Sequence, residues 1–338
     1  MISKRFSFAW AGMLCLALAY LSTPHSSQAQ GAYVYVTQWG SQGAGDGQFR
    51  WPLGIATDGD GNVYVADPLC GPSPSIQKFT STGTFILRWG PYGTGDGELA
   101  WPNGLATDAS GNVYVADSDN HRIQKFTGTG VYLTQWDVSV GPYGPAGVAT
   151  DADGNVFVTA GSSVWKFTST GVHLTHWGSQ GAGDGQFMGA LGVATDASGN
   201  VYVADVSNHR IQKFSGTGEY LTQWGSNGYG AGEFLWPYGV ATDGAGHVFV
   251  VDEGMSNVEV FTSTGTYITQ LGEAGFGNGE FMNPEALATD QAGNVYVSDL
   301  NNWRVQKFSP APTPTVTQSW RGVKARYLPG ASAATQDK

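Results

Sequence analysis

The chain has 338 residues, of which 41% are hydrophobic and 13% are charged, and its net charge is −11. A globular chain with 50 glycines is expected to contain many tight turns rather than long helices. The excess of acidic residues argues against nucleic acid as a partner, because phosphate groups attract a basic surface.

Residues 1–29 have the pattern of a signal peptide. Lys4 and Arg5 precede an apolar run of 16 residues that ends at Leu21, and small residues occupy positions 27 and 29. The run is short for a membrane span, which needs about 20 residues. We therefore expect cleavage after Ala29 and a secreted, periplasmic or cell-surface protein, with a retained N-terminal anchor as the alternative.

The predicted mature chain keeps all 27 acidic residues and 14 of the 16 basic ones, since Lys4 and Arg5 are lost. Cys70 is then its only cysteine, so no internal disulfide can form. The stability of the fold must come from its core.

Six copies of one pattern follow the leader. Ala-Thr-Asp recurs with its aspartate at positions 58, 108, 151, 196, 243 and 290, and an alternating run such as Val113 to Asp117 follows each copy. A second phrase ends in phenylalanine at positions 79, 126, 167, 214, 261 and 308. A third phrase ends in tryptophan at positions 39, 89, 136, 177 and 224, and in Leu271 in the remaining copy.

These short, alternating, β-branched and aromatic phrases predict β-strands, and no stretch after the leader keeps a helical period. We name the four strands of each unit a (ending in Ala-Thr-Asp), b, c and d. Four strands in a unit of about 47 residues predict a propeller blade, and six units predict an all-β, six-bladed β-propeller with four antiparallel strands per blade. A parallel β-helix is disfavoured because its rungs are much shorter.

The two ends of the pattern predict how the ring closes. The chain begins with a d strand, Tyr33 to Trp39, and its last certain strand is a c strand that ends at Phe308. A second candidate d strand ends at Trp320, 12 residues after Phe308, whereas the corresponding spacing is 10 in the internal blades that have this tryptophan. We therefore predict closure by the N-terminal strand, a propeller over residues 30–309, and a linker and flexible tail over residues 310–338.

The repeated phrases resemble the NHL repeat. Residues 177–214 contain them in order: Trp-Gly, Gly-x-Gly-x-Phe, Gly-Val-Ala-x-Asp, Gly-Asn-Val-Tyr-Val-Ala-Asp and Asn-His-Arg-Ile-Gln-Lys-Phe. The resemblance covers residues 33–308 and implies a bacterial, extracytoplasmic six-bladed propeller with a ligand-binding or protein-binding face. It implies no single activity, since this fold hosts lyases, lactonases, RNA-binding modules and sensor domains.

The b–c turns and the d-to-a linkers share one face of the predicted disc, which we call the top face. The loops that vary in length lie there, including three extra residues between Asp67 and Ile76 and four fewer after Trp136. Variable loops on a rigid scaffold are where function usually resides. The linkers hold one base, Arg50, and seven acids, which are Asp46, Asp96, Glu98, Asp184, Glu233, Glu273 and Glu280. We expect an acidic top face.

Candidate binding residues surround the predicted central channel. We call the residue just before the glycine of each strand a, or before the residue equivalent to that glycine, the rim position. The six rim positions are Leu53, Asn103, Ala146, Leu191, Tyr238 and Glu285. Trp51, Trp101 and Trp236 lie behind three of these residues, and aromatic rings beside an open channel suit peptide or sugar binding. The alternative is that these tryptophans pack over the next blade.

Acidic residues recur at the ends of the b strands. Three aspartates, at positions 117, 205 and 299, are each followed five residues later by an arginine, which predicts a charge-assisted brace across the b–c hairpin. Asp67 and Asp252 lack this arginine, so we expect them to be freer for ligand contact. The segments that begin at Asp58 and Asp151 imitate the start of a calcium loop, but Leu69 and Ser162 stand where its final glutamate would be. All six Ala-Thr-Asp aspartates are expected to hold their own turns instead.

No residue set predicts a metal or a cofactor. The five mature histidines fall on different faces and cannot meet around one ion, and a lactonase-like site would have only Glu285 and Asn103 at the channel mouth. We expect a monomeric, non-enzymatic binding or scaffold module that recognises a protein, peptide or glycan through the top face. A metal-dependent lyase or lactonase and a purely structural surface protein are the alternatives.

Overall fold

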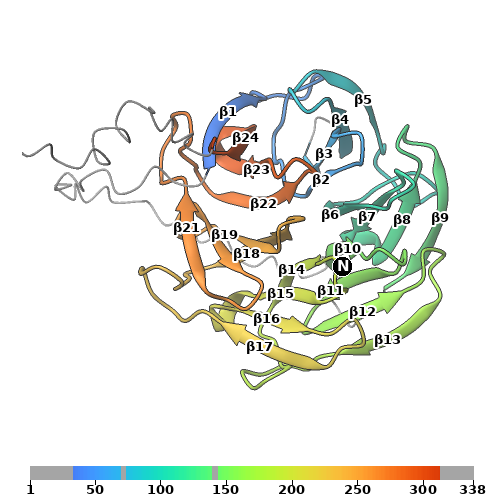
Figure 1. Ribbon diagram of the computed structural model, residues 1–338. Coiled ribbons are helices and arrows are strands. Elements are labelled where there is room, and N and C mark those ends of the chain that lie inside the picture. The colour runs from blue at the N-terminus through green and yellow to red at the C-terminus, as the bar shows by residue number, and fades with distance from the viewer. Residues whose placement is uncertain (1–32, 70–73, 139–143, 313–338) are drawn as a thin grey trace, which may run out of the picture. The chain divides into compact units, whose positions relative to one another are not determined.

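The computed structural model describes residues 33–69, 74–138 and 144–312. This part of the chain forms six four-stranded antiparallel sheets arranged as the blades of a ring (Figure 1). The predicted signal peptide, Cys70, most of the predicted tail and parts of the two variable loops lie outside the described residues. In the described part, no helix is long and apolar enough to cross a membrane.

Each blade runs from an inner strand a to an outer strand d. The a strands are β2 (Ile55–Thr57), β6 (Pro102–Thr107), β10 (Pro145–Thr150), β14 (Ala190–Thr195), β18 (Pro237–Thr242) and β22 (Pro284–Thr289). The b strands are β3 (Val63–Asp67), β7 (Val113–Asp117), β11 (Val156–Ala160), β15 (Val201–Asp205), β19 (His247–Asp252) and β23 (Val295–Asp299). The c strands are β4 (Ser75–Phe79), β8 (Arg122–Phe126), β12 (Ser163–Phe167), β16 (Arg210–Phe214), β20 (Asn257–Thr262) and β24 (Arg304–Pro310). The d strands are β5 (Phe85–Trp89), β9 (Tyr132–Asp137), β13 (His173–Trp177), β17 (Tyr220–Trp224), β21 (Tyr267–Leu271) and β1 (Tyr33–Trp39).

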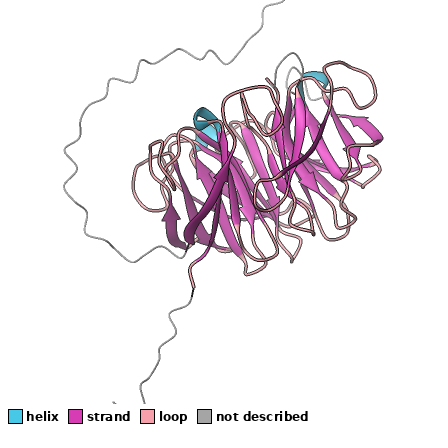
Figure 2. Cartoon of the chain, turned by 90° about the horizontal axis from the view of Figure 1, so that it is seen from above, coloured by secondary structure: helices cyan, strands magenta, loops and turns pink. Residues whose placement is uncertain are grey.

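Three of the b–c turns contain a short 3-10 helix. These are η1 (Ser118–Asn120), η2 (Val206–Asn208) and η3 (Leu300–Asn302), and they mark the top face of the disc (Figure 2). The residue after each helix has a left-handed backbone, for example His121 with φ of 53°. This conformation turns the chain back into strand c.

The ring is closed by the N-terminal strand, as the sequence predicted. β1 pairs antiparallel with β24, from Tyr33 opposite Pro310 to Trp39 opposite Val305, and forms the outer edge of the sixth blade. Blade 6 therefore combines residues from both ends of the repeat region. The ring is thus closed by backbone hydrogen bonds within blade 6, and the linker after β1 carries the chain into blade 1.

Burial differs between the strands because only the outer ones face solvent. In β3, β7, β11, β15 and β23 all five residues are buried, since both faces of the sheet are covered by neighbouring blades. In β5, β9 and β17 half-buried and exposed residues alternate. This explains why the b phrases are almost wholly apolar while the d phrases alternate.

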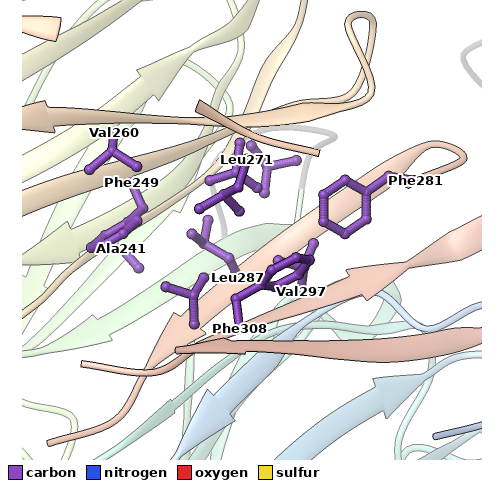
Figure 3. Close-up of a cluster of buried hydrophobic side chains, with 11 residues drawn as sticks. Ala241, Phe249, Val260, Leu271, Phe281, Leu287, Val297 and Phe308 are labelled. Atoms are coloured by element: carbon purple, nitrogen blue, oxygen red, sulfur yellow. The ribbon is translucent and has the colours of Figure 1, made fainter. Parts of the chain in front are cut away.

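The core consists of apolar clusters between successive blades. The cluster between blades 5 and 6 includes Phe249, Val260 and Leu271 from blade 5 and Phe281, Val297 and Phe308 from blade 6 (Figure 3). Tyr33 and Tyr35 of the closing strand pack against it. Stability is therefore shared among six equivalent interfaces, and any one that is opened exposes a large apolar surface.

A ring of threonine hydrogen bonds joins all six inner strands. The hydroxyl of Thr107 donates to the carbonyl oxygen of Thr57 at 2.6 Å, and Thr57 donates to that of Thr289, also at 2.6 Å. The threonines at positions 150, 195, 242 and 289 complete the circle with distances of 2.7 Å. These are the threonines of Ala-Thr-Asp, so the repeated tripeptide links each blade to the preceding one.

The predicted braces and turns are confirmed. Arg122, Arg210 and Arg304 place Nε 2.7–2.8 Å from Oδ2 of Asp117, Asp205 and Asp299. Each Ala-Thr-Asp aspartate accepts the backbone N–H of the residue four positions later. These carboxylates are occupied within their own turns, which accounts for the resemblance to a calcium loop.

Blade 5 departs from the pattern at a buried position of strand c. Four blades have a glutamine there, such as Gln212, whose Nε2 donates to the carbonyl oxygen of Gln186 at 2.7 Å. Blade 5 has Glu259, whose Oε2 accepts the N–H of Gly232 while Oε1 has no hydrogen-bond partner among the described residues. Burial, with a smaller effect of the nearby Asp252 carboxylate, raises the pKa of Glu259 to about 7.

We expect Glu259→Gln to stabilise the protein above neutral pH. The folded chain keeps the Glu259 proton up to about pH 7, whereas the unfolded chain loses it near pH 4.5, so stability falls between these values. At about 1.4 kcal/mol per pKa unit, the variant should gain roughly 3 kcal/mol at pH 8 and little at pH 4. Urea unfolding at both values measures this. The matched control Gln212→Glu should introduce the same loss of stability at high pH in blade 4. Unfolding free energies with the same pH dependence in the wild type and both variants would contradict the raised pKa of Glu259.

Candidate functional site

The inner strands enclose a channel cavity of about 140 Å³. The predicted rim positions all line it: Leu53, Asn103, Ala146, Leu191, Tyr238 and Glu285. The sequence register of the six repeats therefore identified the channel wall correctly. Three of these six residues can form hydrogen bonds with a ligand, and they come from blades 2, 5 and 6.

Close approach of neighbouring a strands explains the small residue that follows each rim position. A Cβ placed on Gly104 would meet the carbonyl oxygen of Ala146 at 2.5 Å. Only glycine allows the blades to approach so closely there. The channel is narrow for this reason, and the rim side chains are held by rigid strands rather than by loops.

Polar groups gather on the side of the channel formed by blades 5 and 6. Burial, with the nearby charge of Glu253, raises the pKa of Glu285 to about 8. Burial also raises the pKa of Glu253, with a smaller contribution from Asp252. The pKa of Tyr238 is raised by burial and by both glutamates. The three groups are thus electrostatically coupled, and we call Tyr238, Glu253 and Glu285 the acidic mouth.

Two asparagines extend the acidic mouth. Asn283 donates from Nδ2 to Oε1 of Glu253 at 2.7 Å, and Asn301 donates from Nδ2 to Oδ1 of Asn283 at 2.8 Å. Asn283 has a left-handed backbone with φ of 54°. This chain of hydrogen bonds fixes the Glu253 carboxyl between blades 5 and 6.

Glu253 and Asn283 were not predicted as site residues from the sequence. Glu253 is the first residue of its b–c turn, where the other blades have Pro68, Ser118, Gly161, Val206 and Leu300. Asn283 takes the position that tryptophan holds in three blades. A comparison of equivalent positions would have found both, because each differs in chemistry from its counterparts.

The rim tryptophans differ in exposure. Trp236 is 52% exposed and Trp101 is 36% exposed with φ of 60°, an uncommon conformation for a bulky residue. Trp51 is half-buried. Thus Trp101 and Trp236 present aromatic surface at the top face, and Trp51 presents less.

The expectation that Asp67 and Asp252 are free for ligand contact is wrong. Both are 0% exposed. Asp67 accepts backbone N–H groups from Arg50, Trp51 and Leu69 at 2.8–3.3 Å. Asp252 accepts three in the same way, from residues 235, 236 and 255 at 2.7–3.1 Å. Backbone donors replace the missing arginine, so these carboxylates anchor the linker before strand a.

Several linker acids also have structural partners. Glu98, Glu233 and Glu280 accept the N–H of the glycine three residues earlier at 2.8–2.9 Å. Asp46 pairs with Arg88 at 3.3 Å on the surface. These contacts hold the linkers in shape, while the carboxylates still contribute negative charge to the top face.

The histidines lie where the sequence placed them, on different parts of the ring. His209 contacts the carbonyl oxygen of Leu235 at 2.6 Å on the top face, and His176 stacks on Trp165 at the outer edge of blade 3. His247 begins β19 on the opposite face. Over the described ranges, no group of three or more His, Cys, Asp or Glu residues is arranged to hold a metal ion.

Comparisons with known families agree with the geometry. The NHL repeat family model matches residues 99–126 and 187–214, and the family described as a 6-bladed beta-propeller matches residues 240–309. The chain is an NHL-repeat six-bladed β-propeller. No curated protein matches this propeller.

Solved structures share the fold of this propeller at low sequence identity. A streptogramin B lyase is 15% identical with a TM-score of 0.55, and the match covers 82% of this chain and 98% of the lyase. A gluconolactonase from Xanthomonas campestris is 16% identical with a TM-score of 0.58, covering 79% and 88%. A protein of unknown function from Bacteroides thetaiotaomicron is 15% identical with a TM-score of 0.65, covering 82% and 75%. These likenesses establish the fold alone.

Proposed function

We propose that this propeller is an exported, non-enzymatic binding module that takes a basic segment of a protein or peptide at the acidic mouth. The observation that carries the proposal is the coupling of Glu253 and Glu285 beside the channel, where burial disfavours the charge of both carboxyls. A lysine or arginine side chain would supply a positive charge that stabilises the ionised carboxyls where burial keeps water away. Export is supported by the leader sequence, and mass spectrometry of the secreted protein would then find Gln30 first.

Aromatic surface on the top face, at blade 5 and at blade 2 across the channel, supports a peptide ligand further. Trp101 and Trp236 are exposed at the top face, and Tyr238 lines the channel. Tryptophan and tyrosine offer large rigid contact areas at low cost in side-chain entropy. A glycan could stack on the same rings, but it would leave the two glutamates without a cation.

A lyase or lactonase is the second candidate, because proteins of both kinds share this fold. Glu285 and Asn103 line the channel and could contribute two ligands to a metal. Elemental analysis after dialysis separates the two functions. Metal retained in stoichiometric amount and lost in Glu285→Gln would favour the enzyme.

We expect Trp101→Ala combined with Tyr238→Ala to weaken binding of basic peptides roughly five- to 150-fold, because two aromatic contacts are worth about 1–3 kcal/mol together. The full chain is first screened on arrays of peptides and glycans, and the affinity of a selected peptide is then measured by calorimetry. His173→Ala on the outer strand β13 is the matched control. Selection of neutral glycans only, or unchanged affinity in the double variant, would contradict the basic-peptide proposal.

We expect the affinity for a basic peptide, measured by the same calorimetry, to depend on pH. Glu285, with a pKa of about 8, is mostly protonated at pH 7, and a bound cation favours its charged form. Affinity should therefore rise between pH 6 and 9, with release of a proton on binding at pH 7. Glu285→Gln should bind more weakly at pH 9 and show a much flatter pH profile.

A further inference from the structure

The a–b and c–d turns form the bottom face, where lysine side chains bridge neighbouring blades. We call each interface between two neighbouring blades a seam. Lys213 is typical: its Nζ lies 5.1 Å from the ring centre of Tyr202 and 4.0 Å from Oδ2 of Asp196. It also donates to the carbonyl oxygen of Ser263 in the c–d turn of the next blade at 3.0 Å. The equivalent lysines are Lys78, Lys125, Lys166 and Lys307, so five of the six seams carry one.

The seam between blades 5 and 6 lacks this lysine. Val260 replaces the lysine, and Phe249 stands where four blades have a tyrosine. The next blade offers no c–d turn, because its outer strand is β1, and the two strand ends Pro310 and Tyr33 meet there instead. A cavity of about 490 Å³ lies at this place, lined among others by Tyr33, Asp243, His247, Val260, Gln291 and Pro310. We call it the seam pocket.

The carboxylate of Asp243 has fewer side-chain donors than its counterparts in blades 1, 2, 4 and 6. In blade 3, Asp151 also has one side-chain hydrogen-bond donor among the described residues, Asn155 Nδ2, but the Lys166 ammonium lies 3.9 Å from its Oδ2. Oδ2 of Asp196 accepts the side-chain N–H of Asn200 and the hydroxyl of Tyr202, both at 2.8 Å, and lies near the Lys213 ammonium. Oδ2 of Asp243 receives one side-chain donor over the described residues, His247 Nδ1 at 2.7 Å.

Two features of the seam pocket bear on the charge of its ligand. Phe249 has no hydroxyl and Val260 has no ammonium, so two of the donors seen in other blades are missing. Burial, and then the negative charge of Asp243, raise the pKa of Tyr33 to about 12. The negative charge of Asp243 therefore acts on Tyr33, which also lines the pocket. A cation with N–H donors would satisfy this carboxylate.

We propose that the seam pocket binds a primary alkylammonium group, the group that the other five seams supply from their own lysines. The apolar stem would lie along Val260 and Ile268, and the ammonium would donate to Oδ2 of Asp243. In four of the other seams a lysine ammonium lies 3.2–4.0 Å from Oδ2 of the equivalent aspartate. The pocket lies on the face opposite the acidic mouth, so the two sites are independent.

Titration of the full chain with two probes tests the proposal. Nα-acetyl-lysine methylamide represents a lysine within a polypeptide, and n-butylamine represents a free amine. Binding of the first alone assigns the ligand to a polypeptide, and comparable binding of both assigns it to free amines. Nα-acetyl-norleucine methylamide, which has the stem without the charge, should not bind. Failure of both amines to bind at millimolar concentration would overturn the proposal.

Two variants locate the site. Asp243→Asn keeps the acceptor for the turn amides but removes the charge, and it should lower affinity at least about tenfold. Val260→Lys supplies the ammonium in cis and should abolish binding. Asp196→Asn in blade 4, where Lys213 fills the seam, is the matched control and should bind like the wild type. Wild-type affinity in a folded Asp243→Asn variant would refute the assignment, and the double variant at Trp101 and Tyr238 should leave this binding intact.

Discussion

A chain that lacks residues 30–39 is expected to lose the folded propeller, whereas a chain that lacks residues 313–338 is expected to unfold at the wild-type urea concentration. The first deletion removes β1 and exposes the backbone edge of β24, which otherwise pairs from Val305 to Pro310. It also removes Trp39, whose ring centre lies 5.9 Å from that of Phe79 and 6.2 Å from that of Tyr296.

The size of the effect follows from the core contacts that are lost. Removing a buried tryptophan side chain alone costs about 3–5 kcal/mol, and domains are stable by only about 5–15 kcal/mol in total. The loss of Tyr33 and Tyr35 from the blade 5–blade 6 cluster adds to this. We therefore expect aggregation or an unfolded spectrum by circular dichroism.

A connected closing strand provides the matched control. Joining Phe308 to Tyr35 through the five residues that join Phe126 to Tyr132 in blade 2 would turn the closing strand into an ordinary d strand. This variant, with a new N-terminus after Trp39, should fold. If the tail deletion proves more damaging than the strand deletion, closure by β1 is wrong.

Removal of one braced aspartate is the second change with a large expected effect. Asp205→Ala should destabilise the propeller by about 3–5 kcal/mol, because the charge of Arg210 stays buried without its partner. Oδ2 of Asp205 accepts Nε of Arg210 and Nδ2 of Asn208, both at 2.8 Å, and Oδ1 accepts the N–H of Met188. All of these donors would lose their acceptor.

Blade 3 supplies the control for this prediction. Ala160 and Ser163 are paired in β11 and β12 where Asp205 and Arg210 are paired in β15 and β16, so the fold tolerates the loss of both charges. Asp205→Ala combined with Arg210→Ser should therefore cost less than Asp205→Ala alone. Urea unfolding of the three proteins measures the difference. A double variant that is less stable than the single variant would show that the unpaired arginine is not the cause.

The sequence alone determined the number of blades, the strand that closes the ring and the residues that line the channel. These features follow from local patterns that repeat with nearly constant spacing, such as the alternation in Val113 to Asp117 and the ten residues from Phe126 to Trp136. Strand pairing within a blade is fixed by short turns, so a repeated phrase has the same place in every blade. The Asp–Arg braces were predictable because both partners belong to one hairpin.

The tertiary structure alone decided which of those residues are available to a ligand. Asp67 looked unpaired because its arginine is missing, yet backbone N–H groups 16 and 17 residues earlier surround it. The acidic mouth brings together Tyr238, Glu253 and Glu285 from three separate segments, and the seam pocket lies where the two ends of the repeat region meet. Such contacts depend on distances between blades and on backbone donors, and neither is written in the spacing of one repeat.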